Sequence, residues 1–168
     1  MLVLAAALLS LAAAVDVARA ADTPADKTQP AGASSLNPRD RGKYMLIVGS
    51  CNDCHTADFA AKNGNVPERD WLKGSALGFA GPWGTTYAPN LRLTLAKLTE
   101  PQWVRYAKDL KTRPPMPWFN LSQWTEHDLR AFYRYVRSLG PPGDPAPAFV
   151  PFGAPAPQPS VQWPAPPK

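Results

Sequence analysis

The sequence has few of the residues that build disulfide frameworks or multi-ligand metal sites. Its 168 residues include only two cysteines and two histidines. A structural zinc ion normally takes four cysteine or histidine ligands from paired motifs. Here Cys51, Cys54 and His55 lie together, and His127 is the only other candidate. The composition therefore argues against a structural zinc site and against a network of disulfides.

Long apolar runs are also scarce. The one clear run covers residues 1–15, shorter than the about 20 residues that cross a bilayer. It is followed by Ala18-Arg19-Ala20, a small-x-small cleavage pattern, so we predict a signal peptide over residues 1–20, cleaved near Ala20, and export to the periplasm. An uncleaved membrane anchor is the alternative. We expect no membrane span in the mature chain.

Neither sign of charge dominates strongly. The chain has 18 Lys and Arg against 13 Asp and Glu, a formal net charge of +5. This excess is too small and too evenly mixed with acidic residues to favour a nucleic-acid partner. A moderately basic protein would be steered toward acidic patches on other proteins, and Lys108, Lys111 and Arg113 are candidates for that role.

Proline is abundant, and its distribution divides the chain. The 21 prolines cluster toward the two ends. Residues 21–36 have little apolar content and are predicted to form a disordered leader. Residues 141–168 are dominated by Pro and Ala and are predicted to be an extended, Pro-rich extension. The predicted folded domain is residues 37–140.

Three helices are expected in this domain, with no strand among its main elements, which predicts an all-α fold. Each helix begins at a capping residue, respectively Asn37, Thr99 and Thr125. Apolar residues recur at helical spacing in the second and third of them. Residues 57–98 are interrupted by glycines and prolines and are expected to be rich in loops. The expected helices cover residues 38–50, 99–110 and 125–139.

The chemical signal is Cys51-Asn-Asp-Cys54-His55. A Cys-x-x-Cys-His motif places two thiols to form thioether bonds with one haem, and its histidine can bind the iron. We therefore predict one covalently bound haem c. Three alternatives are a thioredoxin-like redox pair, which would require a strand leading into the motif, a zinc site, and a plain disulfide. The last leaves His55 without a role.

A second axial ligand would come from the opposite face of the haem, far from His55 in the sequence. Met116 lies in Arg113-Pro-Pro-Met-Pro-Trp118, where prolines restrict the backbone around one soft sulfur ligand. Met45 is expected to face the helix packing, and His127, in the first turn of a helix, is expected to be solvated. Met116 is thus the predicted sixth ligand. His and Met ligation closes both axial positions, which favours electron transfer over catalysis.

Residues 39–139 resemble class I cytochromes c. A helix leads into the Cys-x-x-Cys-His motif, a loop-rich middle and a proline-bound methionine follow, and an aromatic-rich helix ends the domain. Within this, three stretches look like the cytochrome subunits that accompany periplasmic alcohol and related dehydrogenases. They are Gly81-Pro-Trp-Gly-Thr-Thr-Tyr-Ala-Pro-Asn90, Pro115-Met-Pro-Trp118 and Asp128-Leu-Arg-Ala-Phe-Tyr.

The resemblance implies further residues near the haem. The carbonyl of Pro82 would orient the His55 imidazole. Tyr87 and Asn90 would lie by the propionates, and Trp83 and Trp118 would form walls of the pocket. For each aromatic residue, ordinary core packing is the alternative.

The resemblance also implies a function. The protein is expected to be an electron-transfer protein and not an enzyme, serving as a free carrier or as a dehydrogenase subunit. Electrons would come from a periplasmic dehydrogenase and pass along the respiratory chain to a terminal oxidase or another cytochrome. Related membrane-bound subunits often have three such haem motifs, and this chain has one. The alternative is a haem-based sensor or catalytic haem protein with a labile Met116.

The Pro-rich extension has two open interpretations. It contains Phe149, Phe152 and Trp163, spaced along an otherwise small and polar sequence. The extension is either solvated, or it docks through these aromatic residues on the domain or on a dehydrogenase.

Overall fold

A computed structural model describes residues 36–164, which belong to one compact unit. The predicted signal peptide, nearly all of the predicted leader and the last four residues lie outside the described residues. Within residues 36–164, no helix has both the length and the apolar character needed to cross a bilayer.

Three longer helices form the frame, and each begins at the expected cap. Asn37 accepts hydrogen bonds from the backbone of Arg39 and Asp40. Thr99 and Gln102 form a reciprocal capping box, and the Thr125 side chain accepts from the Asp128 backbone. These contacts confirm the predicted helix starts. The helices are α1 (Pro38–Val48), α4 (Glu100–Asp109) and α6 (Glu126–Ser138).

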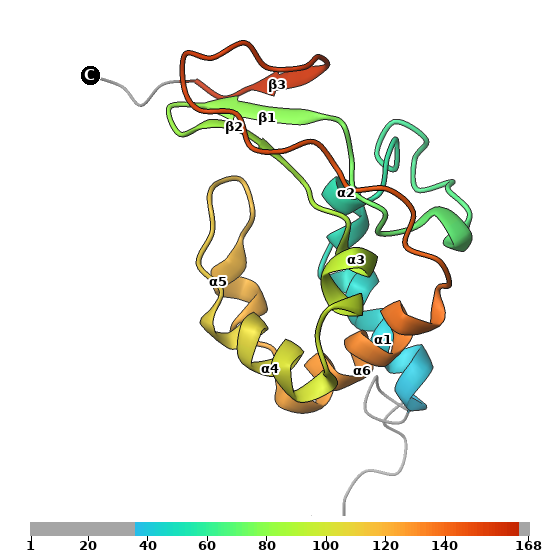
Figure 1. Cartoon of the computed structure of the whole chain (residues 1–168). Helices are drawn as coiled ribbons and strands as arrows, with labels where there is room; N and C mark the ends of the chain where they lie inside the picture. Colours follow the sequence, from blue (N-terminus) through green and yellow to red (C-terminus); the bar gives the residue numbers. More distant parts are fainter. Residues whose placement is uncertain (1–35, 165–168) are drawn as a thin grey trace, which may run out of the picture. The chain divides into compact units, whose positions relative to one another are not determined.

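Shorter elements fill the chain between and after these helices (Figure 1). Four are single helical turns or little more: α2 (Cys51–His55), the 3₁₀ helix η2 (Glu68–Asp70), α3 (Leu91–Ala96) and α5 (Trp118–Leu121). Three are strands: β1 (Gly78–Gly81), β2 (Gly84–Tyr87) and β3 (Ser160–Gln162).

The strands form one small sheet in the order β2-β1-β3. β1 and β2 are an antiparallel hairpin with Gly78 opposite Tyr87, and β3 pairs parallel to β1 with Gly78 opposite Ser160. The all-α prediction is therefore corrected to a mostly helical domain with a small sheet. The two hairpin strands are too short and too rich in glycine for a period-2 pattern, and β3 depends on a distant partner.

The core lies where α1 crosses α6. At Gly42 a Cβ would come within 2.6 Å of the Tyr135 Cβ and would meet the Ala131 carbonyl, so only glycine permits this close approach. Trp103 of α4 stacks on Phe132 of α6, with ring centroids 5.4 Å apart. Burial of these apolar faces is the main stabilising contribution. The buried core residues include Leu46, Trp71, Leu72, Leu95, Trp103, Val104, Leu129, Phe132, Tyr135 and Val136.

A buried arginine connects the core to the chain after α6. Arg92 of α3 is 3% exposed, and burial lowers the pKa of its guanidinium. Its three nitrogens donate only to backbone carbonyls. These carbonyls supply hydrogen-bond acceptors for the guanidinium without any carboxylate. The acceptors are Glu68 (2.9 Å), Trp71 (2.7 Å), Leu139 (2.7 Å) and Pro141 (3.2 Å).

Residues 141–164, here called the strap, run back along the hairpin (Figure 1). The backbones of Val150 and Thr85 exchange two hydrogen bonds of 2.8 and 3.0 Å, and β3 completes the sheet. The Trp163 ring lies 6.3 Å from Phe79 and 6.2 Å from Trp83, centroid to centroid. Of the two interpretations of this segment, docking on the domain is the one that the described residues show.

Candidate cofactor site

The Cys-x-x-Cys-His motif forms its own helical turn, α2. Gly49 ends α1, and Ser50 adopts a left-handed backbone conformation with φ of 53°, which lets a new helix begin at Cys51. Positions i and i+3 lie on the same face of a helix, so Cys51 and Cys54 share one side of this turn. Both thiols are free and half-buried. A helix and not a strand leads into the motif, unlike the context of a thioredoxin-like pair.

The electrostatics of the two thiols also differ from those of a redox-active pair. Burial raises the pKa of the Cys51 thiol to about 12, and it raises the pKa of Cys54 as well. Reactive cysteines have a lowered pKa because the thiolate is the nucleophile. Both thiols are therefore protonated at neutral pH, which disfavours thiol–disulfide chemistry at this site.

His55 is buried, with 6% of its surface exposed. Its Nδ1 lies 2.8 Å from the carbonyl oxygen of Pro89. A carbonyl can only accept, so Nδ1 donates and the lone pair is on Nε2. Burial lowers the pKa of His55, which keeps the ring neutral. Within residues 36–164 no protein group bonds to Nε2, so this nitrogen is available to a metal ion.

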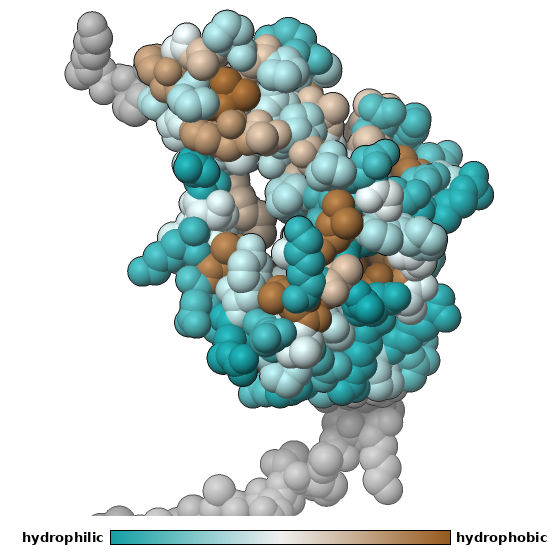
Figure 2. Space-filling model, in the orientation of Figure 1, coloured by the Kyte–Doolittle hydropathy of each residue, from teal (hydrophilic) through white to brown (hydrophobic). Residues whose placement is uncertain are grey.

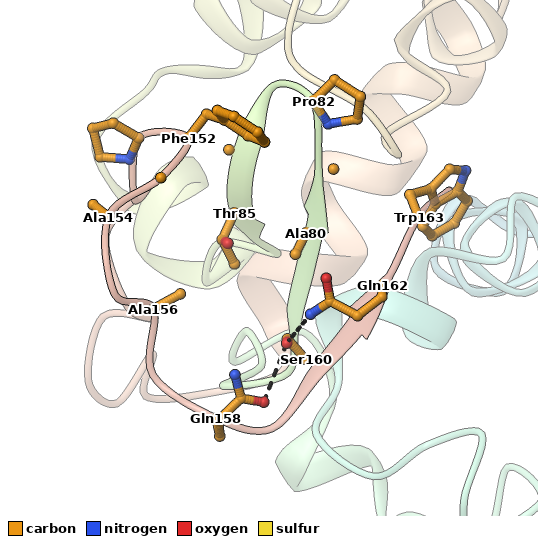
Figure 3. Close-up of a pocket in the computed structure, with 14 residues that line it drawn as sticks. Ala80, Pro82, Thr85, Phe152, Ala154, Ala156, Gln158, Ser160, Gln162 and Trp163 are labelled. Atoms are coloured by element: carbon orange, nitrogen blue, oxygen red, sulfur yellow. Dashed lines mark hydrogen bonds between the residues drawn. The ribbon is translucent and has the colours of Figure 1, made fainter. Parts of the chain in front are cut away.

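The sequence prediction named the wrong residue as the source of the carbonyl that orients His55. Pro82 was expected to supply it, and Pro89 does. Pro82 sits at the tip of the hairpin, and Pro89 follows the end of β2. Pro82 instead lines a cavity of about 440 Å³ between the hairpin and the strap, where Gln162, Ser160 and Gln158 form a line of hydrogen bonds (Figure 3).

The polar groups of Tyr87 and Asn90 hold the strap. The Tyr87 hydroxyl donates to the Pro157 carbonyl at 3.0 Å. The Asn90 amide donates to the carbonyls of Pro142 (2.7 Å) and Asp144 (2.9 Å), while its oxygen caps α3. These side chains were expected beside the propionates, and the structure gives their donors other partners.

Two polar atoms that sequence reasoning did not single out as donors lie near them on the hairpin. The indole Nε1 of Trp83 and the hydroxyl of Thr86 are buried, and neither has a hydrogen-bond partner among residues 36–164. Buried polar atoms are nearly always paired, so the missing partners of these two donors need an explanation. A threonine in a strand carries no sequence signal for such a role.

Replacement of Asn90 by alanine is expected to lower the free energy of unfolding by about 2–3 kcal/mol. The change removes a helix cap worth about 1 kcal/mol and two largely buried hydrogen bonds of about 1 kcal/mol each. Urea unfolding of the purified protein measures the loss. Asn90→Ser keeps a capping oxygen and should recover about 1 kcal/mol of it. An alanine variant within 0.5 kcal/mol of wild type would contradict this account.

Met116 lies in the connection between α4 and α5 and is half-buried. A hollow of about 440 Å³ adjoins this connection, lined by Lys111, Thr112, Arg113 and Trp118. Trp118 opens α5, and its ring meets Phe119 edge-on at 5.7 Å. The surface in Figure 2 is hollowed between this connection and the hairpin. Trp118 thus lines this hollow, and Met116 is not among its lining residues.

The other candidate ligands are placed differently. Met45 is 9% exposed in the helix packing. The His127 side chain is 73% exposed and lies 3.7 Å from the Asp128 carboxylate. Among residues 36–164, no three His, Cys, Asp or Glu side chains converge as they would at a zinc site. Met45 and His127 thus lie as the sequence predicted, in the helix packing and at the surface.

The domain combines a mostly helical frame with two free cysteines that are followed by a buried histidine. Comparison with known proteins gives the more particular result. The chain is 28% identical over 134 residues to the cytochrome c subunit of a quinone alcohol dehydrogenase from Gluconacetobacter polyoxogenes. The corresponding subunit from Komagataeibacter europaeus gives the same identity.

This similarity is distant and partial. It covers 74% of this chain, which spans about 25% of the length of these curated relatives. No family model matches the chain. No solved structure matches it significantly.

Proposed function

We propose that the protein is a c-type cytochrome of the class I fold that carries one electron at a time. Cys51 and Cys54 would attach the haem, and His55 and Met116 would bind its iron. The observation that carries this proposal is the hydrogen bond from His55 Nδ1 to Pro89, which leaves Nε2 available beside two free thiols.

The residues present fit a haem. The two cysteines are free, as thioether formation requires. The unpaired Trp83 Nε1 and Thr86 hydroxyl are donors suited to an anionic group such as a propionate. A hollow adjoins the Met116 connection, and Trp118 lines it.

When bound, haem supplies a reversible one-electron couple at its iron. The protein residues determine how that couple is used. The Pro89 carbonyl fixes the tautomer and orientation of His55, and the thioether sulfur atoms would prevent loss of the group. With His55 and Met116 both bound, no position is left for a substrate. A soft thioether ligand raises the reduction potential relative to a second histidine.

The similarity to dehydrogenase cytochrome subunits supports a place in electron transfer after a dehydrogenase. We propose a periplasmic protein, exported by cleavage near Ala20, whose donor is a dehydrogenase. Its acceptor is a terminal oxidase or another cytochrome, and it acts as a free carrier or as a subunit. The exposed basic residues Lys108, Lys111 and Arg113 would steer an acidic partner toward the Met116 side.

One observation favours a second candidate, a haem sensor or catalytic haem protein. Residues 111–115, just before Met116, make no hydrogen bond to any described residue. A ligand on such a connection could leave the iron and open a coordination position. The first candidate requires that Met116 stay bound at rest.

Spectroscopy of the protein, matured in a host that attaches haem c, tests both candidates. Haem that resists extraction by acidic acetone is expected, because thioethers are covalent. We expect the oxidised protein to show the weak far-red band of a methionine sulfur on ferric haem, and no rapid binding of carbon monoxide after reduction. Extractable haem, or none, would overturn the proposal. Covalent haem without the far-red band would favour the sensor.

A further inference from the structure

The connection that carries Met116 is weakly attached to the rest of the chain. Its three prolines, Pro114, Pro115 and Pro117, have no backbone N–H to donate. No hydrogen bond joins residues 111–115 to any other described residue, and Met116 contributes only its carbonyl, to Trp118 at 2.9 Å. Prolines stiffen a segment locally, but they do not fix its position relative to the domain.

One side-chain contact joins this connection to the strap. The guanidinium carbon of Arg113 lies 3.8 Å from the ring centroid of Phe149, within the range of a cation–π interaction. Arg113 is three residues before Met116, and Phe149 belongs to the strap. Arginine suits this role because its flat guanidinium stacks on an aromatic face.

Phe149 is itself firmly placed. The next residue, Val150, exchanges two backbone hydrogen bonds with Thr85 of β2. At Gly84, whose φ is +101°, a Cβ would lie 2.9 Å from the Phe149 ring and would meet the Val150 carbonyl. The hairpin is therefore shaped to receive this part of the strap, since any side chain at position 84 would displace it.

The hairpin also leads to the other proposed ligand. β2 continues to Pro89, whose carbonyl bonds to His55. Contacts thus run from the Met116 connection through Arg113, Phe149 and Thr85 to the segment that orients His55. The strap is part of the frame that supports both ligands.

We propose that Arg113 and Phe149 are positioning residues that tie the Met116 connection to the strap and set how readily the methionine sulfur leaves the haem iron. This inference rests on the proposed function. It also distinguishes the two candidate functions. A strong Arg113–Phe149 contact would keep Met116 bound, as an electron carrier requires, and a weak contact would let Met116 leave the iron, as a sensor requires.

The test is the rate at which imidazole displaces the sulfur in the oxidised holoprotein, followed by loss of the far-red band. Phe149→Leu keeps the apolar bulk and removes the aromatic face, and Arg113→Gln removes the cation. Each is expected to accelerate displacement roughly threefold to thirtyfold, the range that corresponds to a cation–π contact. The double variant should be no faster than the faster single variant, because both remove one contact.

Matched controls separate positioning from charge and from general loosening. Arg105→Gln removes the same charge from an exposed position of α4, and Phe152→Leu makes the same change at a strap residue that is 74% exposed. Both should leave the rate within about twofold of wild type. Arg113→Lys and Phe149→Tyr should restore part of the slow rate, since each retains a cation or a ring.

The outcomes distinguish the two levels of the proposal. A wild-type protein without the far-red band would refute the axial assignment of Met116 and with it the proposed function. A wild type with the band, and unchanged rates in Phe149→Leu and Arg113→Gln, would overturn the positioning role alone. Equal acceleration in Phe152→Leu or Arg105→Gln would also overturn it.

Discussion

Replacement of Met116 by alanine is expected to leave the haem attached while opening its iron. The proposed thioethers at Cys51 and Cys54 would not depend on the sixth ligand, so the variant should retain covalent haem. It should lose the far-red band and bind carbon monoxide readily when reduced. Loss of the soft sulfur should lower the reduction potential by on the order of 0.1 V, part of the about 0.8 V range that axial ligands set.

Optical spectra with and without carbon monoxide, together with a redox titration, measure these effects. Met45→Leu is the matched control, because it removes the other methionine of the described chain from a buried position in α1. That variant should keep the wild-type spectrum and potential. A Met116→Ala protein that retains the far-red band would show that another residue is the sixth ligand.

Substitution of Gly42 by valine should produce the largest loss of stability. Gly42 lies where α1 crosses α6, and a Cβ would meet the Ala131 carbonyl and lie 2.6 Å from the Tyr135 Cβ. Replacing a helical glycine normally gains up to about 1 kcal/mol in propensity. Here the clash with backbone should outweigh that gain, for a net loss of about 3 kcal/mol or more. This is a large part of the 5–15 kcal/mol typical of a domain.

Urea unfolding followed by tryptophan fluorescence gives the free energy for this comparison. Val48→Ala, at a position of α1 that is 54% exposed, should change it by no more than about 0.5 kcal/mol. A Gly42→Val protein as stable as Val48→Ala would mean that the two helices separate without cost, contrary to the described crossing.

The helical frame was predictable because its signals are local. The caps at Asn37, Thr99 and Thr125 lie within four residues of the groups that they satisfy. The cysteine pair and His55 were equally evident, since five consecutive residues define the motif. Local chemistry fixes such features without reference to the rest of the chain.

The features that sequence reasoning missed depend on distant partners. The carbonyl that holds His55 belongs to Pro89, and a backbone acceptor has no side-chain signature. The buried Arg92 bonds only to carbonyls, so no acidic residue indicates its position. β3 lies in a segment rich in proline, and only its pairing with β1 makes it a strand.

The parallel pairing of β3 with β1 has a consequence for the order of events during synthesis. Chains emerge N-terminus first, so β1 and the motif at 51–55 are made long before residues 160–162. Until those residues appear, the sheet lacks its third strand. The hairpin and the helical turn at 51–55 can therefore form before the strap is present, whereas the contact between Arg113 and Phe149 cannot.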